Sequence, residues 1–374
     1  MVEKFSLKDH LFNATKVEKI SGEIVAVYPS FERAAFVREV VSGFPERELK
    51  ARITWIAACL KKYLPSEYIK AVKILLRALP EPNNPELSDD DFGDFIYAPY
   101  GEFVAKYGCT HEYLNISLKA LYEITQRFSM EDAIRYFINA FPKETLSVLQ
   151  TWSADSHYHV RRLCSEGTRP KLPWSQKIVL HVKDPLPLLD VLFSDATRYV
   201  TRSVANHMND IAKVNPQLAL ATLKRWKNSK KQKKEEMDYI VRHALRGLVK
   251  EGNPEALALL GFAHNADIAL SNLSVPMQAK INTALEFSFV VESTENTNAL
   301  VDYILYFQNK AGKMESKKVF KLTQVQLKQG KTTPLRKRHM LRGQMTTRTL
   351  YRGTHKLVIQ VNGKALAEAH FMLT

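Results

Sequence analysis

The 374-residue sequence has little cysteine, no long apolar run and no apolar block near its N-terminus. Its three cysteines, Cys59, Cys109 and Cys164, are an odd number spaced 50 and 55 residues apart, which fits neither a disulfide framework nor a metal site. No stretch reaches the roughly 18 apolar residues that a membrane helix needs. Charges scattered through the first 25 residues argue against a signal peptide. We therefore expect a cytoplasmic protein with reduced cysteines and no membrane contact.

The sequence also lacks the short motifs of several common enzyme chemistries. It contains no glycine-rich phosphate loop, no HExxH, no CxxC and no GxSxG. The eleven histidines show no ligand spacing, and His157 and His159 alternate in SHYHV without a third partner. We expect no cofactor and no metal.

The net charge of +15 and the pI near 9.5 indicate a polyanionic partner. A merely basic protein is the alternative, and the position of the charge bears on the choice. Residues 1–266 carry 38 Lys and Arg against 32 Asp and Glu, whereas residues 316–367 carry 13 Lys and Arg and no acid. Exposed strands and turns normally mix both signs, so this acid-free stretch favours phosphate contacts over a solvated basic face.

Residues 1–266 are expected to be helical, because apolar residues recur there at three- and four-residue spacing. Clear amphipathic runs are AFVREVVSGF, ELKARITWIAACLKKYL, EYIKAVKILLRAL, YLNISLKALYEITQRF and LALATLKRWK. Ser66, Pro142 and Pro254 stand where a helix cap or a first-turn proline belongs. The pattern predicts about a dozen helices and no strand before residue 270.

The pattern changes in the last part of the chain. ALEFSFVVES, ALVDYILYFQN and HKLVIQVNG are rich in β-branched and aromatic residues, and Arg352-Gly353 and Asn362-Gly363 are turn signals. Residues 267–374 are therefore predicted to form a small all-β sandwich of immunoglobulin type, without the paired cysteines of antibody domains. We place the domain boundary in a linker at 262–272.

An internal repeat of 40 residues runs through the second half of the helical part. YHVRRLCSEG, RYVTRSVANH and DYIVRHALRG align. The repeat has one apolar and one arginine position, occupied by Val160, Val200 and Ile240, and by Arg162, Arg202 and Arg242. Such a period in a mainly α chain indicates a HEAT-like helical-repeat solenoid with a concave surface. There are two interpretations of the recurring arginine. It forms hydrogen bonds within or between repeats, or it is part of a constant scaffold that exposes the variable residues after it.

Those variable residues include acids. One helical turn after the arginine stand Glu166, Asn206 and Arg246, and one turn further stands Asp210. A groove that only binds nucleic acid would contain cations alone, because carboxylates repel phosphates. Carboxylates in a basic groove therefore indicate a reaction at a positively charged centre of the substrate. Surface salt bridges are the alternative explanation. Trp174, on the proline-rich connection EGTRPKLPW, either contacts a flat cation through its indole face or packs against a neighbouring helix.

These segments are similar to the AlkC branch of the HEAT-like-repeat alkylpurine DNA glycosylases. The resemblance covers most of residues 1–266 and rests on HVRRLCSEGTRPKLPW, RSVANHMNDIAK and IVRHALRGLVKEGNPEALALLGF, and more loosely on SMEDAIRYFI. The last segment departs from the family pattern at Tyr136, where proline is expected, and at Asp132, which crowds Glu131. The larger form of this family also carries an immunoglobulin-like domain after the helices, as the strand-rich tail would supply.

The resemblance implies a monofunctional glycosylase that hydrolyses the N-glycosidic bond of cationic alkylated bases, such as 3-methyladenine and also 3-methylcytosine and 1-methyladenine. A base alkylated at a ring nitrogen leaves without a general acid, so the enzyme must stabilise an oxocarbenium-like sugar and position water. By position in the matching motifs, the implied active-site residues are Asp210, Glu166, Trp174, Glu131 and Arg162. Asp210 is assigned to stabilise the sugar cation and align the water, and Trp174 to contact the lesion nucleotide. Glu131 and Glu166 are assigned to add negative electrostatic field and to orient the reacting groups, and Arg162 to support these residues.

The expected partner is double-stranded DNA containing alkylated bases, bound by a monomer. Phosphate contacts are expected from Arg161, Arg169, Lys171, Arg202, Asn206, Arg242, His243 and Arg246 in the helical part, and from Arg336, Lys337, Arg338, Arg342, Arg348 and Arg352 in the tail. The alternative function is a non-catalytic HEAT-repeat module that binds nucleic acid. Glu166, Trp174 and Asp210 together favour the glycosylase, because a mere binder gains nothing from acids in its groove.

Overall fold

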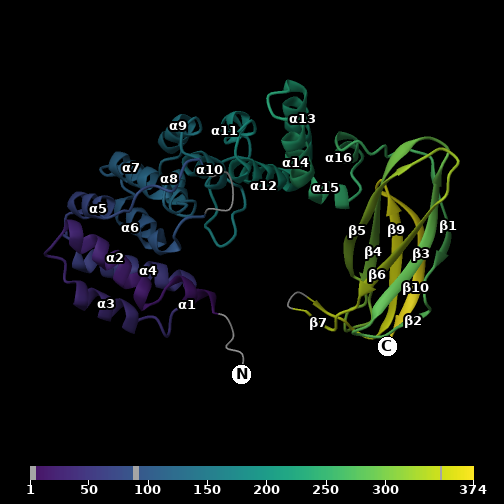
Figure 1. Ribbon diagram of the computed structural model, residues 1–374, viewed down its shortest axis with the longest axis horizontal. Helices are drawn as coiled ribbons and strands as arrows, with labels where there is room; N and C mark the ends of the chain where they lie inside the picture. Colours follow the sequence, from purple (N-terminus) through teal and green to yellow (C-terminus); the bar gives the residue numbers. More distant parts are fainter. Residues whose placement is uncertain (1–5, 87–91, 346–347) are drawn as a thin grey trace. The chain divides into compact units, whose positions relative to one another are not determined.

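The computed structural model describes residues 6–86, 92–345 and 348–374, with helices first and strands after them (Figure 1). The described residues contain sixteen α-helices and one 3-10 helix: α1 (Leu7–Leu11), α2 (Ala14–Val27), α3 (Arg33–Ser42), α4 (Leu49–Tyr63), α5 (Tyr68–Arg77), η1 (Phe95–Tyr97), α6 (Ala98–Gly108), α7 (Leu114–Thr125), α8 (Ile134–Ala140), α9 (Pro142–Trp152), α10 (Tyr158–Glu166), α11 (Leu186–Leu192), α12 (Arg198–Val214), α13 (Pro216–Ser229), α14 (Lys234–Ala244), α15 (Arg246–Lys250) and α16 (Pro254–Leu259). Among these helices, none combines the length and the apolar character required to cross a membrane.

The contacts within the chain divide it into two compact units. The first comprises residues up to 211 together with 225–243, and the second comprises 212–224 together with 244–374. The second unit thus combines strands with helical residues. The domain boundary that the sequence places between residues 266 and 267 stays a prediction.

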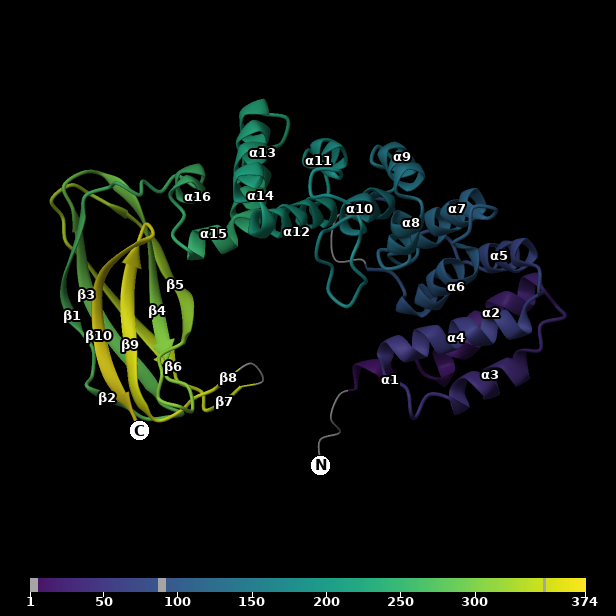
Figure 2. The ribbon, with the colours of Figure 1, turned by 180° about the vertical axis from the view of Figure 1, so that it is seen from behind.

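Helices of the first unit pack mainly on helices one or two places away along the chain, while α5 packs on α2, α6 and α7. α2 packs on α3, α3 on α4, α4 on α6 and α6 on α7, and the series α8, α9, α10 and α11 continues in the same way. Figures 1 and 2 show this succession from two sides. The apolar position of the 40-residue repeat is fully buried at Val160, Val200 and Ile240. The repeat is therefore a packing unit of a HEAT-like solenoid, in which stacked helices bury one continuous core.

The amphipathic runs form helices close to their expected bounds. AFVREVVSGF forms α3, for example, and LALATLKRWK lies within α13. Pro142 and Pro254 are the first residues of α9 and α16, as predicted. Ser66 is not a cap, because Glu67 occupies that position before α5. The first residue of α5 is Tyr68, which is buried and hydrogen-bonded to Ser117, so tertiary packing sets this start.

The strands of the second unit form the predicted immunoglobulin-like sandwich. They are β1 (Ile268–Ser274), β2 (Gln278–Ala279), β3 (Ala284–Ser293), β4 (Thr297–Phe307), β5 (Ser316–Leu327), β6 (Thr333–Met340), β7 (Gln344–Met345), β8 (Arg348–Thr349), β9 (Gly353–Val361) and β10 (Lys364–Leu373). One sheet has the order β1-β3-β6 and the other β2-β10-β9-β4-β5, while β7 pairs with β8. Alternate residues of β3, from Leu285 to Val291, pack into the shared core with Val301, Tyr303 and Leu305 of β4.

The connection between α16 and β1 is shorter than the predicted linker at 262–272. β1 already begins at Ile268, because residues 268–271 pair with β3. Within the second unit, Leu257 of α16 and Phe262 form a small core with Leu300 of β4. The last helix is therefore packed on the sandwich.

The two predicted turn signals lie on either side of β9. Asn362 and Gly363 connect β9 to β10 with φ angles of +45° and +81°, the left-handed region that a tight hairpin of this kind needs. The Asn362 side chain also accepts a hydrogen bond from the backbone N–H of Leu300 at 2.8 Å. Gly353 begins β9 with a φ of +132°, a conformation that residues with a side chain rarely adopt.

Candidate active site

Five charged side chains of the first unit form an alternating chain: Glu131, Arg162, Glu166, Arg169 and Asp210. Arg162 Nη1 lies 2.7 Å from Glu131 Oε2, and Arg162 Nη2 lies 3.8 Å from Glu166 Oε2. Arg169 Nη1 lies 2.5 Å from Glu166 Oε1, and Arg169 Nη2 lies 2.9 Å from Asp210 Oδ2. Three carboxylates and two guanidinium groups leave one negative charge in excess. The structure thus brings together four of the five predicted catalytic residues and adds Arg169.

Successive helical repeats supply this chain. Arg162 and Glu166 are one turn apart on α10, so their side chains lie on the same face of that helix. Asp210 comes from α12, and Glu131 from the turn that precedes α8. Ser129 joins the first pair, since it accepts a hydrogen bond from Arg162 and donates one to Glu131. Stacking of the repeats therefore gathers acids that are up to 79 residues apart in sequence.

Glu166 is a buried carboxylate that stays ionised. Only 5% of its surface is exposed, and this burial opposes its charge. The guanidinium groups of Arg162 and Arg169 outweigh the burial, and Ser203 donates a hydrogen bond to Oε2 at 2.6 Å. Together they lower the pKa of Glu166. A fixed, ionised carboxylate in a site of low polarity can stabilise a developing positive charge strongly.

Asp210 is as buried as Glu166, with 4% of its surface exposed. Arg169 contacts its Oδ2 through both Nε, at 3.0 Å, and Nη2. Burial opposes the charge of Arg169, but the Glu166 and Asp210 carboxylates outweigh it and raise the pKa of the guanidinium. Arg169 therefore links the two buried acids as a permanent cation.

The connection that carries Arg169 and Trp174 is fixed by a buried arginine of α8. Arg135 donates from Nη1 to the carbonyls of Gly167 and Arg169, at 3.0 and 2.9 Å, and from Nε to the carbonyl of Gln176 at 2.8 Å. Its side chain is almost fully buried, with 1% exposed. Arg135 thus holds both ends of a ten-residue segment around Trp174.

Trp174 lies on this connection and not in a helix, as predicted. Its side chain is 79% exposed, which excludes the core-packing reading. Its φ angle is +62°, a conformation that costs a bulky residue about 1 to 2 kcal/mol. Lys50 of α4 donates to the Trp174 carbonyl at 2.6 Å and pairs with Asp132, so the strained residue is tied to the helices.

A cavity of about 350 Å³ lies between Trp174 and the Glu131–Arg162 pair. Its walls are mainly apolar and include Leu49, Ile53, Phe92, Phe95, Phe128, Met130 and Tyr199. Arg162 stacks over the Tyr199 ring at 4.5 Å, and Phe92 meets the same ring edge-on at 5.4 Å. The space combines apolar and aromatic walls with a few charged groups, Glu131 and Arg162 among them, as suits a flat heterocycle.

His207 lies behind the carboxylates on α12 and is fully buried. Its Nδ1 donates to the Ser165 carbonyl at 3.0 Å, and its Nε2 has no hydrogen-bond partner among the described residues. Burial lowers the pKa of His207 to about 3, so the imidazole is neutral at physiological pH. His207 therefore adds no charge to the site.

The residues expected to contact phosphate in the helical part differ in their surroundings. Arg161 forms an ion pair with Asp195 at 2.6 Å and donates to the carbonyls of Asp155 and Ser156, so its groups are engaged inside the protein. Lys171 and Arg242 are exposed, and Arg202 is half-buried. Asn206, His243 and Arg246 are also half-buried, and His243 bonds to Asn206 at 2.8 Å. Their contact with DNA stays a prediction.

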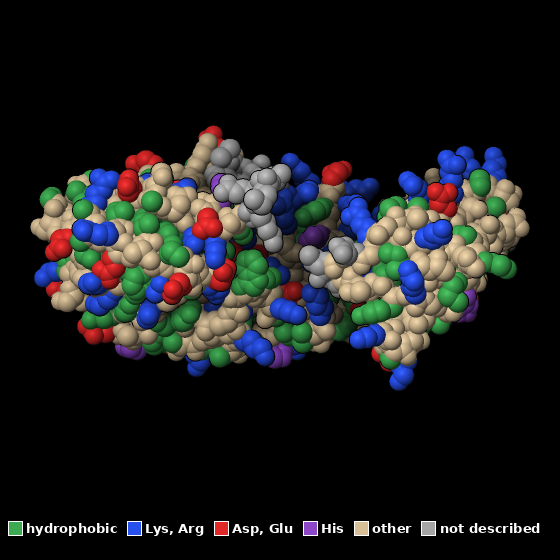
Figure 3. All heavy atoms as spheres, turned by 90° about the horizontal axis from the view of Figure 1, so that it is seen from below, with side chains coloured by type: hydrophobic (Ala, Val, Ile, Leu, Met, Phe, Trp, Pro, Cys, Tyr) green, Lys and Arg blue, Asp and Glu red, His purple; other side chains and the backbone are tan. Residues whose placement is uncertain are grey.

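The cations of the tail are mostly exposed. Arg336, Arg338, Arg342 and Arg352 are exposed, while Lys337 is half-buried. Arg348 instead stacks on Phe307 at 3.6 Å, and burial lowers its pKa. On the face of the sandwich shown in Figure 3, Lys and Arg side chains outnumber Asp and Glu. The tail thus offers cations to a polyanion, with Arg348 as the member that packs inward.

Sequence reasoning missed four residues that shape the site: Arg135, Lys50, Tyr199 and Ser203. Tyr199 and Ser203 belong to the repeat that contains Asp210, at three residues before and one after Arg202 in the alignment. Their side chains face the acids because α12 packs beside α10, and the Ser203 hydroxyl lies 2.9 Å from that of Ser165. For Arg135 the available signal was an arginine within the apolar run AIRYFI, where burial requires partners.

Three comparisons place these features among known proteins. Residues 269–374 match the family model described as the C-terminal Ig-like domain of the uncharacterised protein YhaZ. The chain is 31% identical over 368 residues to an uncharacterised protein YhaZ of Bacillus subtilis (strain 168), which covers 97% of this chain and 98% of YhaZ. The structure is similar, with a TM-score of 0.86 and 33% identity, to Pseudomonas fluorescens alkylpurine DNA glycosylase AlkC bound to DNA containing an abasic site analog. That likeness covers 99% of this chain and 100% of the other.

Proposed function

The chain belongs to the AlkC family, in which HEAT-like helices precede an immunoglobulin-like domain, and from this premise we propose that it is a monofunctional DNA glycosylase for cationic alkylated bases. The observation that carries the proposal is the pair of buried acids, Glu166 and Asp210, linked by Arg169. A protein that only bound DNA would bring acids near phosphates at a cost in affinity. Buried acids whose positions are fixed by an arginine suit a reaction in which positive charge develops.

The chemistry follows from the charge of the substrate. In an alkylated base such as 3-methyladenine, the bond to the sugar breaks and its electron pair neutralises the positive ring. The base therefore leaves without protonation, and the sugar becomes oxocarbenium-like. Water then adds its oxygen to C1′ and loses a proton, which completes the hydrolysis. The protein has to stabilise the sugar cation and hold the water.

Asp210 is our choice for both tasks, with Glu166 and Glu131 adding to the negative field. Arg169 fixes the position of Asp210, and Arg162 fixes Glu131 beside the cavity. We accordingly propose that Arg169 is a positioning residue for the carboxylates. This role accounts for its two buried acidic partners better than a phosphate contact does.

Trp174 is proposed to contact the lesion nucleotide. Its exposed indole and the cavity beside it offer aromatic and apolar surface close to Glu131. An aromatic face attracts a cationic ring, an interaction worth about 0.5 to 2 kcal/mol depending on exposure. The same surface gives no advantage to a neutral base that must leave as an anion.

DNA is proposed to contact both the helical part and the sandwich. Exposed Arg336, Arg338, Arg342 and Arg352 support backbone contacts by the tail, which carry no sequence information. We propose residues 1–266 as the glycosylase domain and 267–374 as the second DNA-binding domain, acting as a monomer in the cytoplasm. The substrates include 3-methyladenine, with 3-methylcytosine and 1-methyladenine as further members of the same cationic class.

Base release from methylated duplex DNA tests the proposal. Wild-type protein in excess over DNA should release the methylated base and leave an abasic site that alkali cleaves. A preparation that binds the duplex and releases no base would instead support the non-catalytic module.

A further inference from the structure

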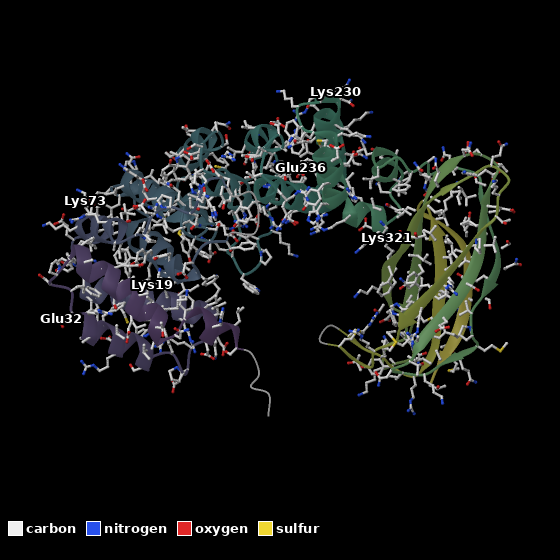
Figure 4. The ribbon with its side chains drawn as sticks, in the orientation of Figure 1. Lys19, Glu32, Lys73, Lys230, Glu236 and Lys321 are labelled. Atoms are coloured by element: carbon white, nitrogen blue, oxygen red, sulfur yellow. The ribbon has the colours of Figure 1, made fainter. Side chains whose placement is uncertain are left out.

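A second concentration of positive charge lies outside the candidate active site, at the end of α13, in the turn that follows it and at the start of α14. Six of the ten residues 225–234 are Lys or Arg, and none is acidic. We name this segment the basic turn; its cations are Arg225, Lys227, Lys230, Lys231, Lys233 and Lys234. All six are exposed. Figure 4 shows Lys230 at the end of α13 and Glu236 on the following helix.

The basic turn is held firmly by the helices beneath it. The Trp226 ring is buried and stacks on Phe193 at 4.8 Å with an interplanar angle of 2°, and its indole N–H donates to Asp190 at 2.7 Å. Gln232 donates to the carbonyls of Phe193 and Asp195, at 3.1 and 2.8 Å. The lysines thus project from an ordered backbone, which lowers the entropy cost of binding a partner.

Nearby acids neutralise only part of this charge. Asp190 pairs with Arg225, and Asp238 lies 3.9 Å from the ammonium of Lys227. Glu236 and Asp195 pair with Arg198 and Arg161, which lie outside the basic turn. Glu235 is exposed beside the turn. Among the described residues, none of the ammonium groups of Lys230, Lys231, Lys233 and Lys234 has an ion-pair partner.

Two of these lysines stand where the helix itself disfavours them. Lys233 directly precedes α14 and Lys234 is its first residue, at the helix N-terminus that carries partial positive charge. Glu235 and Glu236 follow in the first turn, where acids belong, but the lysines before them add like charge. An arrangement that costs stability and is exposed to solvent indicates an anionic partner.

The basic turn is also separate from the alternating chain of acids. It contacts Phe193 and Asp195, just before α12 begins at Arg198, whereas Asp210 stands 12 residues further along that helix. At 1.5 Å per residue, Arg198 and Asp210 lie about 18 Å apart along the helix axis. A duplex rises 3.4 Å per base pair, so the distance corresponds to about five base pairs.

We propose that the basic turn binds the phosphate backbone of duplex DNA at a distance from the lesion, as a surface for general binding and not for catalysis. The inference rests on the proposed function, which makes DNA the polyanion at hand. Lysine ammonium groups act as point charges toward phosphate and read no sequence, so contacts here would add affinity for any flanking DNA. An acidic protein is the competing partner for the same surface.

The test uses the full chain with Lys230, Lys231, Lys233 and Lys234 each changed to Gln. A control variant removes the same charge from four exposed lysines elsewhere on the helices, Lys73, Lys106, Lys119 and Lys143. Affinity is measured against salt for a long unmodified duplex of about 30 base pairs, which extends well beyond the groove on both sides. A second variant with Arg at the same four positions keeps the charge.

On the long duplex, the Gln variant should bind at least about threefold more weakly, with a log–log salt slope smaller by about 0.9 for each lost phosphate contact. The control and the Arg variant should keep the wild-type slope, and the single-turnover rate of base release at saturating protein should not change. Equal slopes for wild type and the Gln variant on the long duplex would overturn the proposal and leave an acidic protein as the partner to seek. These slopes need no catalysis, so they stay informative even if base release, and with it the proposed function, fails.

Discussion

Arg169 donates to Asp210 through both Nε and Nη2, at 3.0 and 2.9 Å, and the same guanidinium contacts Glu166. The carboxylate proposed to stabilise the sugar cation is therefore fixed before any DNA is present. Such preorganisation avoids reorientation during the reaction, which is the main reason that charged groups in enzymes outperform water. The shared arginine thus contacts both buried acids, and it helps to lower the pKa of Glu166.

Asp210→Asn should lower the single-turnover rate of base release by at least about 100-fold, because the amide keeps the shape but not the charge. Affinity for DNA should barely change, since the charge matters mainly when positive character develops on the sugar. Rates and affinities measured on the same methylated duplex separate the two effects. A variant that retains more than about a tenth of the wild-type rate would remove Asp210 from the central role.

Arg135→Lys should lower both stability and base release, because a single ammonium nitrogen cannot occupy the positions of both Nε and Nη1, from which the guanidinium reaches the Gln176 carbonyl and the carbonyls of Gly167 and Arg169. We expect a loss of about 2 to 4 kcal/mol in the free energy of unfolding. Rates are compared at a temperature where the variant is fully folded by circular dichroism. If base release there equals that of wild type, Arg135 has only a structural role and does not position Arg169.

Trp174→Ala should leave stability within about 0.5 kcal/mol, because the side chain is largely exposed. Excision of cationic lesions should weaken by about 1 to 2 kcal/mol, or roughly 5- to 30-fold in kcat/KM. Trp174→Phe keeps an aromatic face and should retain part of the activity. Wild-type kcat/KM for Trp174→Ala on 3-methyladenine would show that the indole does not touch the lesion.

His207 predicts a pH dependence of stability. Its pKa falls from 6.5 in the unfolded chain to about 3 in the folded one, so the unfolded state binds the proton more readily. The contribution of His207 is complete above pH 6.5 and is lost progressively as the pH falls toward 3. Between pH 6.5 and 5, wild type should lose about 1.6 kcal/mol more than His207→Gln, measured by urea unfolding. Parallel curves for the two proteins would mean that the pKa of His207 is the same in the folded and unfolded states, which contradicts its burial as a neutral group.

The sequence predicts the elements well where the signal is local. The run ALEFSFVVES coincides with β3, and the register of Val160, Val200 and Ile240 identifies a core position. Both follow from side-chain periodicity, which the backbone geometry dictates. Ser66 shows the limit of such reasoning, because the packing of Tyr68 and not a local capping preference decides where α5 begins.

The sequence does not show which acidic side chain each arginine pairs with. Arg161 and Arg162 are adjacent, yet Arg161 pairs with Asp195 toward the next repeat and Arg162 with Glu131 toward the previous one. Arg169 was expected to contact phosphate, and the structure surrounds it with two acids. The pairs Arg161–Asp195, Arg162–Glu131 and Arg169–Asp210 are separated by 34, 31 and 41 residues along the chain. Only the stacking of repeats brings such distant residues into contact.

The most direct measurement of the central claim compares base release from two duplexes that differ only at one nucleotide, 3-methyladenine in one and uracil in the other. Wild-type protein is used in excess, with Asp210→Asn as the matched control. We predict release of 3-methyladenine that Asp210→Asn abolishes, and negligible release of uracil, because uracil leaves as an anion that nearby carboxylates oppose. Efficient release of uracil, or binding of both duplexes with release from neither, would contradict the account.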